Sequence, residues 1–565
     1  MPEQDVRDGT IGSCQEQPRK RHAEYGSVAD VPDPFAVKQQ DIFLFHGGII
    51  EWLRDLECRF GYKVLVVLSA VEHLLAGVMM PLVVSALPYV YTDYGVDSVD
   101  QLIYSAVASM PLSSLQPLFG LVIQTMPVAG YNKTPYYVGS CLLGSTGLLI
   151  AGLSSVESLS TVMLVFCMFA VCLQFGFLGV IISGIQTAKI QEHPQHGPQL
   201  VSFLWFGQLI LVFFTDLSSG LLIEDLGAES LLVVAAVPAL LAMVPGLLGY
   251  LGDRWQTDAD VEAARAEFWA QGELVLLCVL LFAGGVAVAV AGLCASTAAA
   301  CAVSVCVMAV LLFAHSVLLA PNIAALCVFL MVQGSLSWSI GSVEYYFYTD
   351  DAEVYPEGPH FSTVFYNSVL SPASSIAQLG CVWLYGRYMN GWSYRNTMVV
   401  GNVAAILTRL MQAAMFARLN VALGISDYIL LLVGHTDGRA RFLQWLPSMV
   451  VASLVCPKGM ETTVFALLAA CRGFGETVGS DCGALLLEML GADPDGSVGD
   501  EDAFENAWKA SLIVSVLPLL TLPFIFALVP DASPSSDRGR LASGQAVEGS
   551  LVRRWWGRGA RRQLV

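Results

Sequence analysis

The sequence predicts an all-α protein that crosses a membrane many times, with about fourteen transmembrane helices. Of its 565 residues, 55% are hydrophobic and only 13% are charged, whereas soluble domains carry about 25% charged residues. The apolar residues gather in blocks of about twenty, the length at which an α-helix crosses a bilayer. These blocks lack the period-two alternation of a β-barrel, and lipid requires every backbone group to be paired internally, so we expect helices.

The predicted helices follow one another along most of the chain. They cover residues 64–90, 101–124, 135–153, 160–185, 200–223, 231–251, 273–294, 298–319, 321–345, 362–386, 396–417, 440–456, 461–489 and 506–529. Polar sequence flanks them, and we expect residues 1–45 and the basic segment 531–565 to be disordered.

The basic residues predict the orientation. Most of the 28 Lys and Arg residues lie in the two ends and in alternate connections, and such connections face the cytoplasm. Both termini are therefore predicted to be cytoplasmic, with the plasma membrane as the default location. No apolar stretch opens the chain as a cleavable signal would. A net charge of −19 argues against a nucleic-acid partner.

The helices divide into groups of six, two and six. The polar segment 252–272 is predicted to be a cytoplasmic linker between residues 46–251 and the rest. Residues 273–320 contain almost no polar side chain except His315, so we expect an inserted, lipid-facing pair with His315 as a bystander. Residues 321–530 then form the second six-helix bundle. Two bundles of six are the architecture of major-facilitator transporters, whose substrates bind between the bundles.

Four stretches resemble motifs of the folate–biopterin transporter family, in the family's order. They are Met126–Tyr136 after the second helix, His193–Phe203 at the fifth, Tyr345–Asp351 with Gly358–Phe361 after the ninth, and Cys456–Leu468 followed by Gly473, Gly475, Gly479 and Gly483 in the thirteenth. The last stretch is the most specific. The two extra helices resemble the trypanosomatid-type members of the family.

The resemblance implies secondary active transport of folate, biopterin or related pteridines by alternating access. It also leaves an alternative cargo, S-adenosylmethionine, which some trypanosomatid-type relatives carry. The sequence departs from the family at Gln124, where the family has Asp, and in the following loop, whose basic cluster is reduced to the candidate gate residue Lys133. A non-transporting receptor or scaffold is therefore a second class of function.

Glu72 and Asp216 lie inside predicted helices, where a charge costs about 2.5–3.5 kcal/mol. Glu72 could accept two parallel hydrogen bonds from the aminopyrimidine edge that folate and biopterin share. Glu72 and Asp216 are each candidates to bind substrate and to carry a coupled proton. The alternative for each is a hydrogen bond to another helix.

Arg409 lies near the middle of the predicted helix 396–417. A guanidinium binds a carboxylate through two parallel hydrogen bonds, so Arg409 could hold the glutamate tail of folate. The alternative is a structural salt bridge, for example to Asp481 or Glu476.

The helix predicted over 461–489 carries Arg472, Glu476 and Asp481. Arg472 and Glu476 are four residues apart and can pair along the helix, while the glycine ladder allows another helix to approach closely. The pair and the ladder share one face, and Asp481 points the opposite way. We favour a structural role for the pair, with substrate binding by Arg472 as the alternative. The gate or structural residues of this helix are Glu461, Glu476, Asp481, Gly475, Gly479 and Gly483.

Aromatic residues end the predicted ninth helix in the run Tyr345–Tyr348. A pterin ring could stack on Tyr346, but an aromatic belt at the membrane surface has the same composition and is favoured. Glu344, directly before the run, is a candidate gate residue.

Enzyme motifs are absent from the sequence. It contains no GxxxxGK[ST], HExxH or GxSxG, and no soluble domain that could house chemistry. Most of the cysteines lie in apolar blocks without metal-binding spacing. The sequence therefore predicts no enzyme, cofactor or metal site. The predicted partners are a small-molecule substrate and the bilayer, and the oligomeric state stays open.

Overall fold

The computed structural model describes residues 49–193, 197–389, 392–434, 442–455, 461–497, 501–531 and 546–554. Within these ranges the regular elements are helices, and the only β-pairing is an isolated bridge between Val128 and Tyr131. The predicted disordered N-terminus, residues 1–45, lies outside the described ranges, as does most of the tail 531–565. Disorder at both ends stays a prediction.

The first predicted segment is one continuous helix that contains a π-helical stretch. It consists of α2 (Tyr62–Ser69), η1 (Ala70–Met79) and α3 (Met80–Asp93), and follows α1 (Ile49–Phe60). The second segment is interrupted twice. It consists of α4 (Ser98–Ala108), α5 (Met110–Ser113) and α6 (Gln116–Thr125). The other helices of this group are α7 (Thr134–Leu153), α8 (Thr161–Glu192), α9 (Gly197–Leu226), α10 (Ala228–Leu241) and α11 (Val244–Leu247).

The linker contains a helix of its own, α12 (Asp258–Ala270), and the inserted pair is α13 (Gly272–Cys294) and α14 (Thr297–Leu318). The last group comprises α15 (Pro321–Ser335), α16 (Gly341–Thr349), η2 (Val364–Leu370), α17 (Ser371–Leu384), η3 (Tyr385–Met389), α18 (Tyr394–Phe416), α19 (Leu419–Ala422), α20 (Asp427–Gly434), α22 (Phe442–Val455), α23 (Glu461–Leu490), α24 (Glu501–Phe504), α25 (Ala507–Val516), η4 (Leu517–Thr521) and α26 (Leu522–Leu528).

Every predicted segment contains helix, but the number of crossings stays a prediction. Nine helical spans within the described residues are long and apolar enough to cross a membrane. The predicted second, ninth, tenth, twelfth and thirteenth segments are not among them. The ninth is broken between α15 and α16, and α23 is a 30-residue helix that carries charged side chains. Within the predicted twelfth segment the structure describes α22, and a separate apolar helix, α20, lies before it.

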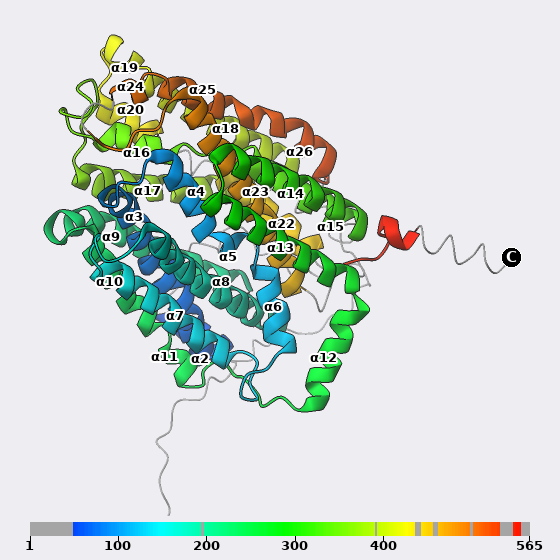
Figure 1. Cartoon of the computed structure of the whole chain (residues 1–565). Coiled ribbons are helices and arrows are strands. Elements are labelled where there is room, and N and C mark those ends of the chain that lie inside the picture. Colours follow the sequence, from blue (N-terminus) through cyan, green and yellow to red (C-terminus); the bar gives the residue numbers. More distant parts are fainter. Residues whose placement is uncertain are drawn as a thin grey trace, which may run out of the picture.

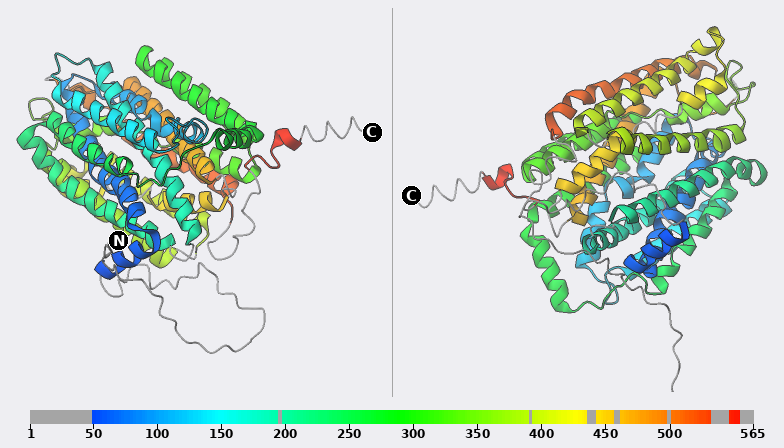
Figure 2. Two further views of the ribbon diagram at one scale, coloured as in Figure 1. Left: turned by 90° about the horizontal axis from the view of Figure 1, so that it is seen from below. Right: turned by 180° about the vertical axis from the view of Figure 1, so that it is seen from behind.

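The two groups of helices lie side by side. In Figure 1 the blue to teal helices gather on one side and the yellow to red helices on the other, and Figure 2 shows the same division from two more directions. Between the groups, α9 packs against both η1 and η2, and α23 packs against α4, α5 and α6. These two helices therefore form much of the contact between the groups.

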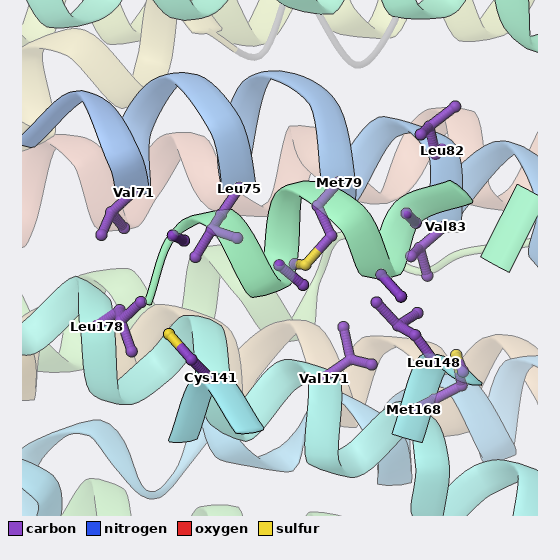
Figure 3. Packing of buried hydrophobic residues seen from close by; sticks show 14 of the residues in the cluster. Val71, Leu75, Met79, Leu82, Val83, Cys141, Leu148, Met168, Val171 and Leu178 are labelled. Carbon is purple, nitrogen blue, oxygen red and sulfur yellow. The ribbon is translucent and has the colours of Figure 1, made fainter. Parts of the chain in front are cut away.

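Apolar side chains fill the interior of the first group. Val71, Leu75 and Met79 of η1 point toward Val171 and Leu178 of α8, as Figure 3 shows. The three η1 side chains are at most 1% exposed. Burying such side chains contributes roughly 1.5–3 kcal/mol each to stability. This core therefore holds one face of the first helix toward α8, so the opposite face turns away from α8.

The inserted pair is less peripheral than its composition predicts. Val310 and Phe313 of α14 are exposed, which agrees with a lipid-facing surface. The opposite faces pack on the bundles, with α13 against α4 and α14 against α23 and α15. His315 is fully buried, and its Nδ1 lies 2.7 Å from the carbonyl oxygen of Leu311. The pair therefore faces lipid on one side and protein on the other, because small residues such as Gly285 let α13 approach the second segment.

The described part of the C-terminal tail is held by the same pair. Arg553 donates from Nε and Nη2 to the two carboxylate oxygens of Glu273, at 2.7 and 2.9 Å. This hydrogen-bonded carboxylate raises the pKa of Arg553. Ala546 and Val547 are fully buried, and the Ala546 carbonyl accepts a hydrogen bond from Ala320 N. The tail segment therefore lies against the junction of α14 and α15.

The glycine ladder of α23 generates a prediction about stability. A Cβ atom on Gly483 would overlap the carbonyl oxygen of Ser339, whereas one on Gly139 of α7 would meet nothing within 4 Å. We expect Gly483→Ala to lose roughly 1–3 kcal/mol of stability through overpacking, and Gly139→Ala to lose none. Thermal unfolding of the two purified variants in one detergent measures this. Equal melting temperatures would contradict the close approach.

Candidate functional site

Glu72 lies in η1 with its side chain partly exposed. In the described part of the chain it has no hydrogen-bond or ion-pair partner. Its neighbours fasten η1 to α9: His73 Nε2 lies 3.3 Å from the Phe203 carbonyl, and the Thr215 hydroxyl donates to the Gly77 carbonyl at 3.2 Å. The helix is therefore held while the carboxylate stays available for a ligand.

Asp216 is buried in α9, where the two groups of helices meet. The hydroxyl of Ser375 in α17 donates to Asp216 Oδ2 at 3.4 Å. Four residues along α9, Gly220 N donates to the hydroxyl of Ser368 at 3.0 Å. The hydrogen bond to another helix, the alternative raised by the sequence, is present, and a part in proton coupling stays a prediction.

Arg409 is buried in α18, and its Nη1 donates to the carbonyl of Val514 in α25 at 3.2 Å. The guanidinium thus serves at least partly to join two helices of the second group. Asp481, one of its predicted partners, contacts Ser304 of α14 instead. Substrate binding by Arg409 stays a prediction.

The predicted pair on α23 is present, with 2.9 Å between Arg472 Nε and Glu476 Oε1. Its expected place on the packed face was wrong for Glu476, whose side chain is 48% exposed. The close approach belongs to the glycines: Gly475 and Gly479 lie against Gly334 of α15. The glycine face and the charged face are adjacent, so the pair lies beside the contact with α15. Glu461 begins α23, and its side chain is outside the described set.

Tyr346 joins the two groups at the predicted external end. Its ring is fully buried, and its hydroxyl donates to the Val96 carbonyl at 2.9 Å. The same oxygen accepts from Gln101 Nε2 at 2.7 Å and from the Thr92 hydroxyl at 3.3 Å. In this conformation the ring is covered, and it lies neither in a lipid-facing belt nor open to a stacking ligand.

We call the contact of Tyr346 with Thr92, Val96 and Gln101 the tyrosine contact. Further contacts between the two groups lie beside it. The Ser342 hydroxyl donates to the Ser98 carbonyl at 2.6 Å, and Tyr345 packs edge-on against Tyr89. Glu344 is half-buried in the same short helix, α16, so its predicted gate role concerns this region.

At the opposite, predicted cytoplasmic end, the loop that carries Lys133 is held by the linker. Asp253 Oδ2 accepts from Lys133 N at 2.8 Å and from Thr134 N at 2.9 Å, which satisfies free amides at the start of α7. Arg265 Nε of α12 donates to the Thr125 carbonyl at 3.1 Å. Lys133 takes part through its backbone, and a gate role for its ammonium group stays a prediction.

A chain of neutral amides, which the sequence analysis missed, crosses the second group. Gln333 Nε2 donates to Gln444 Oε1 at 3.0 Å, and Gln444 Nε2 donates to Asn402 Oδ1 at 2.9 Å. Asn402 Nδ2 then donates to the Thr521 hydroxyl at 2.8 Å. These residues are uncharged, so a search for intramembrane charges does not find them. Amide side chains inside apolar segments are the sequence signal that could have found them.

Comparison with known proteins agrees with this architecture. A crystal structure of the POT family transporter PepTSo superposes with a TM-score of 0.58 at 13% identity and covers 82% of this chain and 97% of its own. A mutant of the nucleoside transporter NupG gives a TM-score of 0.52 at 12% identity, covering 83% and 99%. At such identities the likeness concerns the fold alone.

The sequence comparisons point to one family. The Arabidopsis thaliana protein "Probable folate-biopterin transporter 6" is 22% identical over 75% of this chain and 74% of its own length. "Probable folate-biopterin transporter 4" of the same plant is 22% identical over 86% and 99%. The "Folate-biopterin transporter" of Synechocystis is 24% identical over 74% and 72%.

The chain is thus an integral, multi-pass membrane transporter with a major-facilitator-like fold, and not an enzyme. More specifically, residues 70–541 match the model of the BT1 family, and the chain belongs to that family of folate–biopterin transporters. The relatives given above are from a plant and a cyanobacterium, so similarity to the trypanosomatid-type members stays a prediction.

The tyrosine contact generates a prediction about opening. Tyr346→Phe removes hydrogen bonds that contribute about 1 kcal/mol net. This corresponds to roughly a fivefold shift of the equilibrium between the closed and open forms of this end. We expect a cysteine introduced by Ser98→Cys, buried beneath α16, to react about fivefold faster with an impermeant maleimide when Tyr346→Phe is also present. Tyr131→Phe in the exposed loop is the control, and unchanged labelling would contradict the contact's role.

Proposed function

We propose that this protein is a secondary active transporter of folate, biopterin or related pteridines. It works by alternating access with proton coupling, in the plasma membrane, with both termini in the cytoplasm. The observation that carries the proposal is the family match over residues 70–541, supported by the names of the relatives. Charged side chains on two helices of different groups supply the chemistry for the cargo.

Alternating access requires that the contacts between the groups break and form. The tyrosine contact and the Ser342–Ser98 bond are hydrogen bonds between uncharged groups. Each such bond contributes about 0.5–1.5 kcal/mol net, so cargo binding can offset their loss. An ion pair buried at the same place would cost more to open. The chemistry of this end therefore suits a contact that opens and closes.

The two groups offer complementary charges to a pteridine. The carboxylate of Glu72 in η1 suits the aminopyrimidine edge of the ring, which presents parallel donors. Arg472 in α23, 25% exposed, suits the carboxylates of a folate tail. Because η1 and α23 belong to different groups, a cargo that engages both would draw the groups together.

Uptake measurements test the proposal. Cells that express the protein should accumulate labelled folate or biopterin, and more strongly when the outside is acidic. Unlabelled folate, biopterin and S-adenosylmethionine are the competitors. Binding of pteridine without accumulation would favour the receptor class. Competition by S-adenosylmethionine alone would favour a cationic cargo, for which Glu72 matters and Arg472 does not.

A pair of variants tests the assignment of the cargo ends. Glu72→Gln should reduce uptake of folate and biopterin alike by about tenfold or more, since a hydrogen bond to a charged group contributes about 1.5–3 kcal/mol. Arg472→Gln combined with Glu476→Gln, which leaves no unpaired charge, should reduce folate uptake and spare biopterin, which lacks the tail. Glu157→Gln in an exposed loop is the control. Equal loss of both cargoes in the double variant would contradict the role of Arg472.

A further inference from the structure

Another intramembrane carboxyl group, that of Asp481, lies on the same helix as Arg472. The side chain of Asp481 in α23 is only 3% exposed, and its Oδ2 contacts the hydroxyl of Ser304 in the inserted helix α14. Within the described residues no Lys, Arg or His pairs with Asp481. A buried carboxylate without a cation costs several kcal/mol, so a neutral, protonated form is favoured at this position.

The hydrogen bonds of Ser304 also favour a protonated Asp481. The Ser304 hydroxyl also lies 3.0 Å from the carbonyl of Ala300, one turn back in α14. A hydroxyl has one hydrogen to donate and can accept through its lone pairs. If Ser304 donates to the Ala300 carbonyl, its short contact with Asp481 is satisfied only when the carboxyl group donates a proton to Ser304 Oγ.

In the described part of the chain, the residues around Asp481 provide no cation. Cys301 of α14 and Cys482 of α23 lie beside the site with their sulfur atoms 3.6 Å apart. From the second predicted segment and α13 come apolar side chains, glycines and the hydroxyls of Ser113 and Ser114. Asp481 is therefore the acidic group here, and its neighbours are thiols, hydroxyls and hydrocarbon.

A narrow pocket connects Asp481 with both groups of helices. Its lining includes Asp481 and Thr477 of α23, Met110 and Ser113 of α5, and Gly285 of α13. α5 belongs to the first group and α23 to the second, so a shift of one group against the other changes what faces the carboxyl. The proton affinity of Asp481 then depends on the conformation, which is what coupling requires.

We propose that Asp481 and Ser304 form a proton-binding site through which the inserted helix pair takes part in coupling transport to a proton gradient. This rests on the proposed function as a secondary transporter. The step is one proton transfer: the carboxylate takes a proton from hydronium in the pocket, leaving water, and returns it to water after the groups have moved. Proton binding is thereby assigned to Asp481, while Glu72 serves the cargo.

The first experiment detects the proton without any cargo. Infrared spectra of the purified, lipid-reconstituted protein should contain a carbonyl band of a protonated carboxyl group near neutral pH. Asp481→Asn, which keeps the shape and can still donate to Ser304, should lose that band. Asp258→Asn, at the exposed start of α12, should keep it. Persistence of the whole band in Asp481→Asn would overturn the proposal.

The second experiment separates coupling from movement of the cargo. An inward gradient of one pH unit supports about tenfold accumulation when one proton accompanies one cargo. In proteoliposomes, Asp481→Asn should exchange labelled folate or biopterin for unlabelled cargo at the wild-type rate but show no gradient-driven accumulation. Accumulation equal to that of the wild type would overturn the proposal. If the wild type moves neither pteridine, the proposed function fails, and the infrared band alone decides the proton site.

Discussion

The structure depends on one constraint: a polar group inside the bilayer needs a partner, a proton or water, because hydrocarbon provides none. Each intramembrane charge meets the constraint differently. Arg472 and Glu476 neutralise each other on one helix, Asp216 takes a hydrogen bond from Ser375 of the opposite group, and Asp481 contacts the hydroxyl of Ser304. Within the described residues neither Glu72 nor Asp481 has a cationic partner, so a cargo or a proton can satisfy these two carboxyl groups.

The same constraint explains how much of the fold the sequence could predict. Helices that face lipid on one side must be long and apolar, and the predicted segments of that kind, such as 135–153 and 298–319, match α7 and α14 within a residue or two. Two of the segments that meet the other group, the broken second segment and α23, fail as continuous apolar spans, whereas α9 does not. A helix between two bundles faces protein where other helices face lipid, so it can carry polar, small or kinked positions and hydropathy describes it poorly.

The candidate site was predictable in its charges and unpredictable in its partners. Glu72, Asp216 and Asp481 were recognisable because charge is rare in apolar sequence. Gln101, Ser304 and Ser375, which complete the interactions, are ordinary residues whose importance comes from helices distant in the chain. Tyr346 was assigned to a surface belt on composition, and only the tertiary contact with Gln101 shows that it closes the two groups together.

The inserted helices α13 and α14 lie against both groups of helices. α13 lies on the second segment of the first group and α14 on α23 of the second, so the pair contacts both groups. Its tail contact, Arg553 with Glu273, fixes the start of α13. If the groups shift while α13 follows the first and α14 the second, the strain falls on the packing of α13 against α14. The contact of Ser304 with Asp481 then keeps α14 on α23. A pair of helices that only filled space against lipid would need neither the serine nor the buried acid, since hydrocarbon on both sides would pack as well at lower cost.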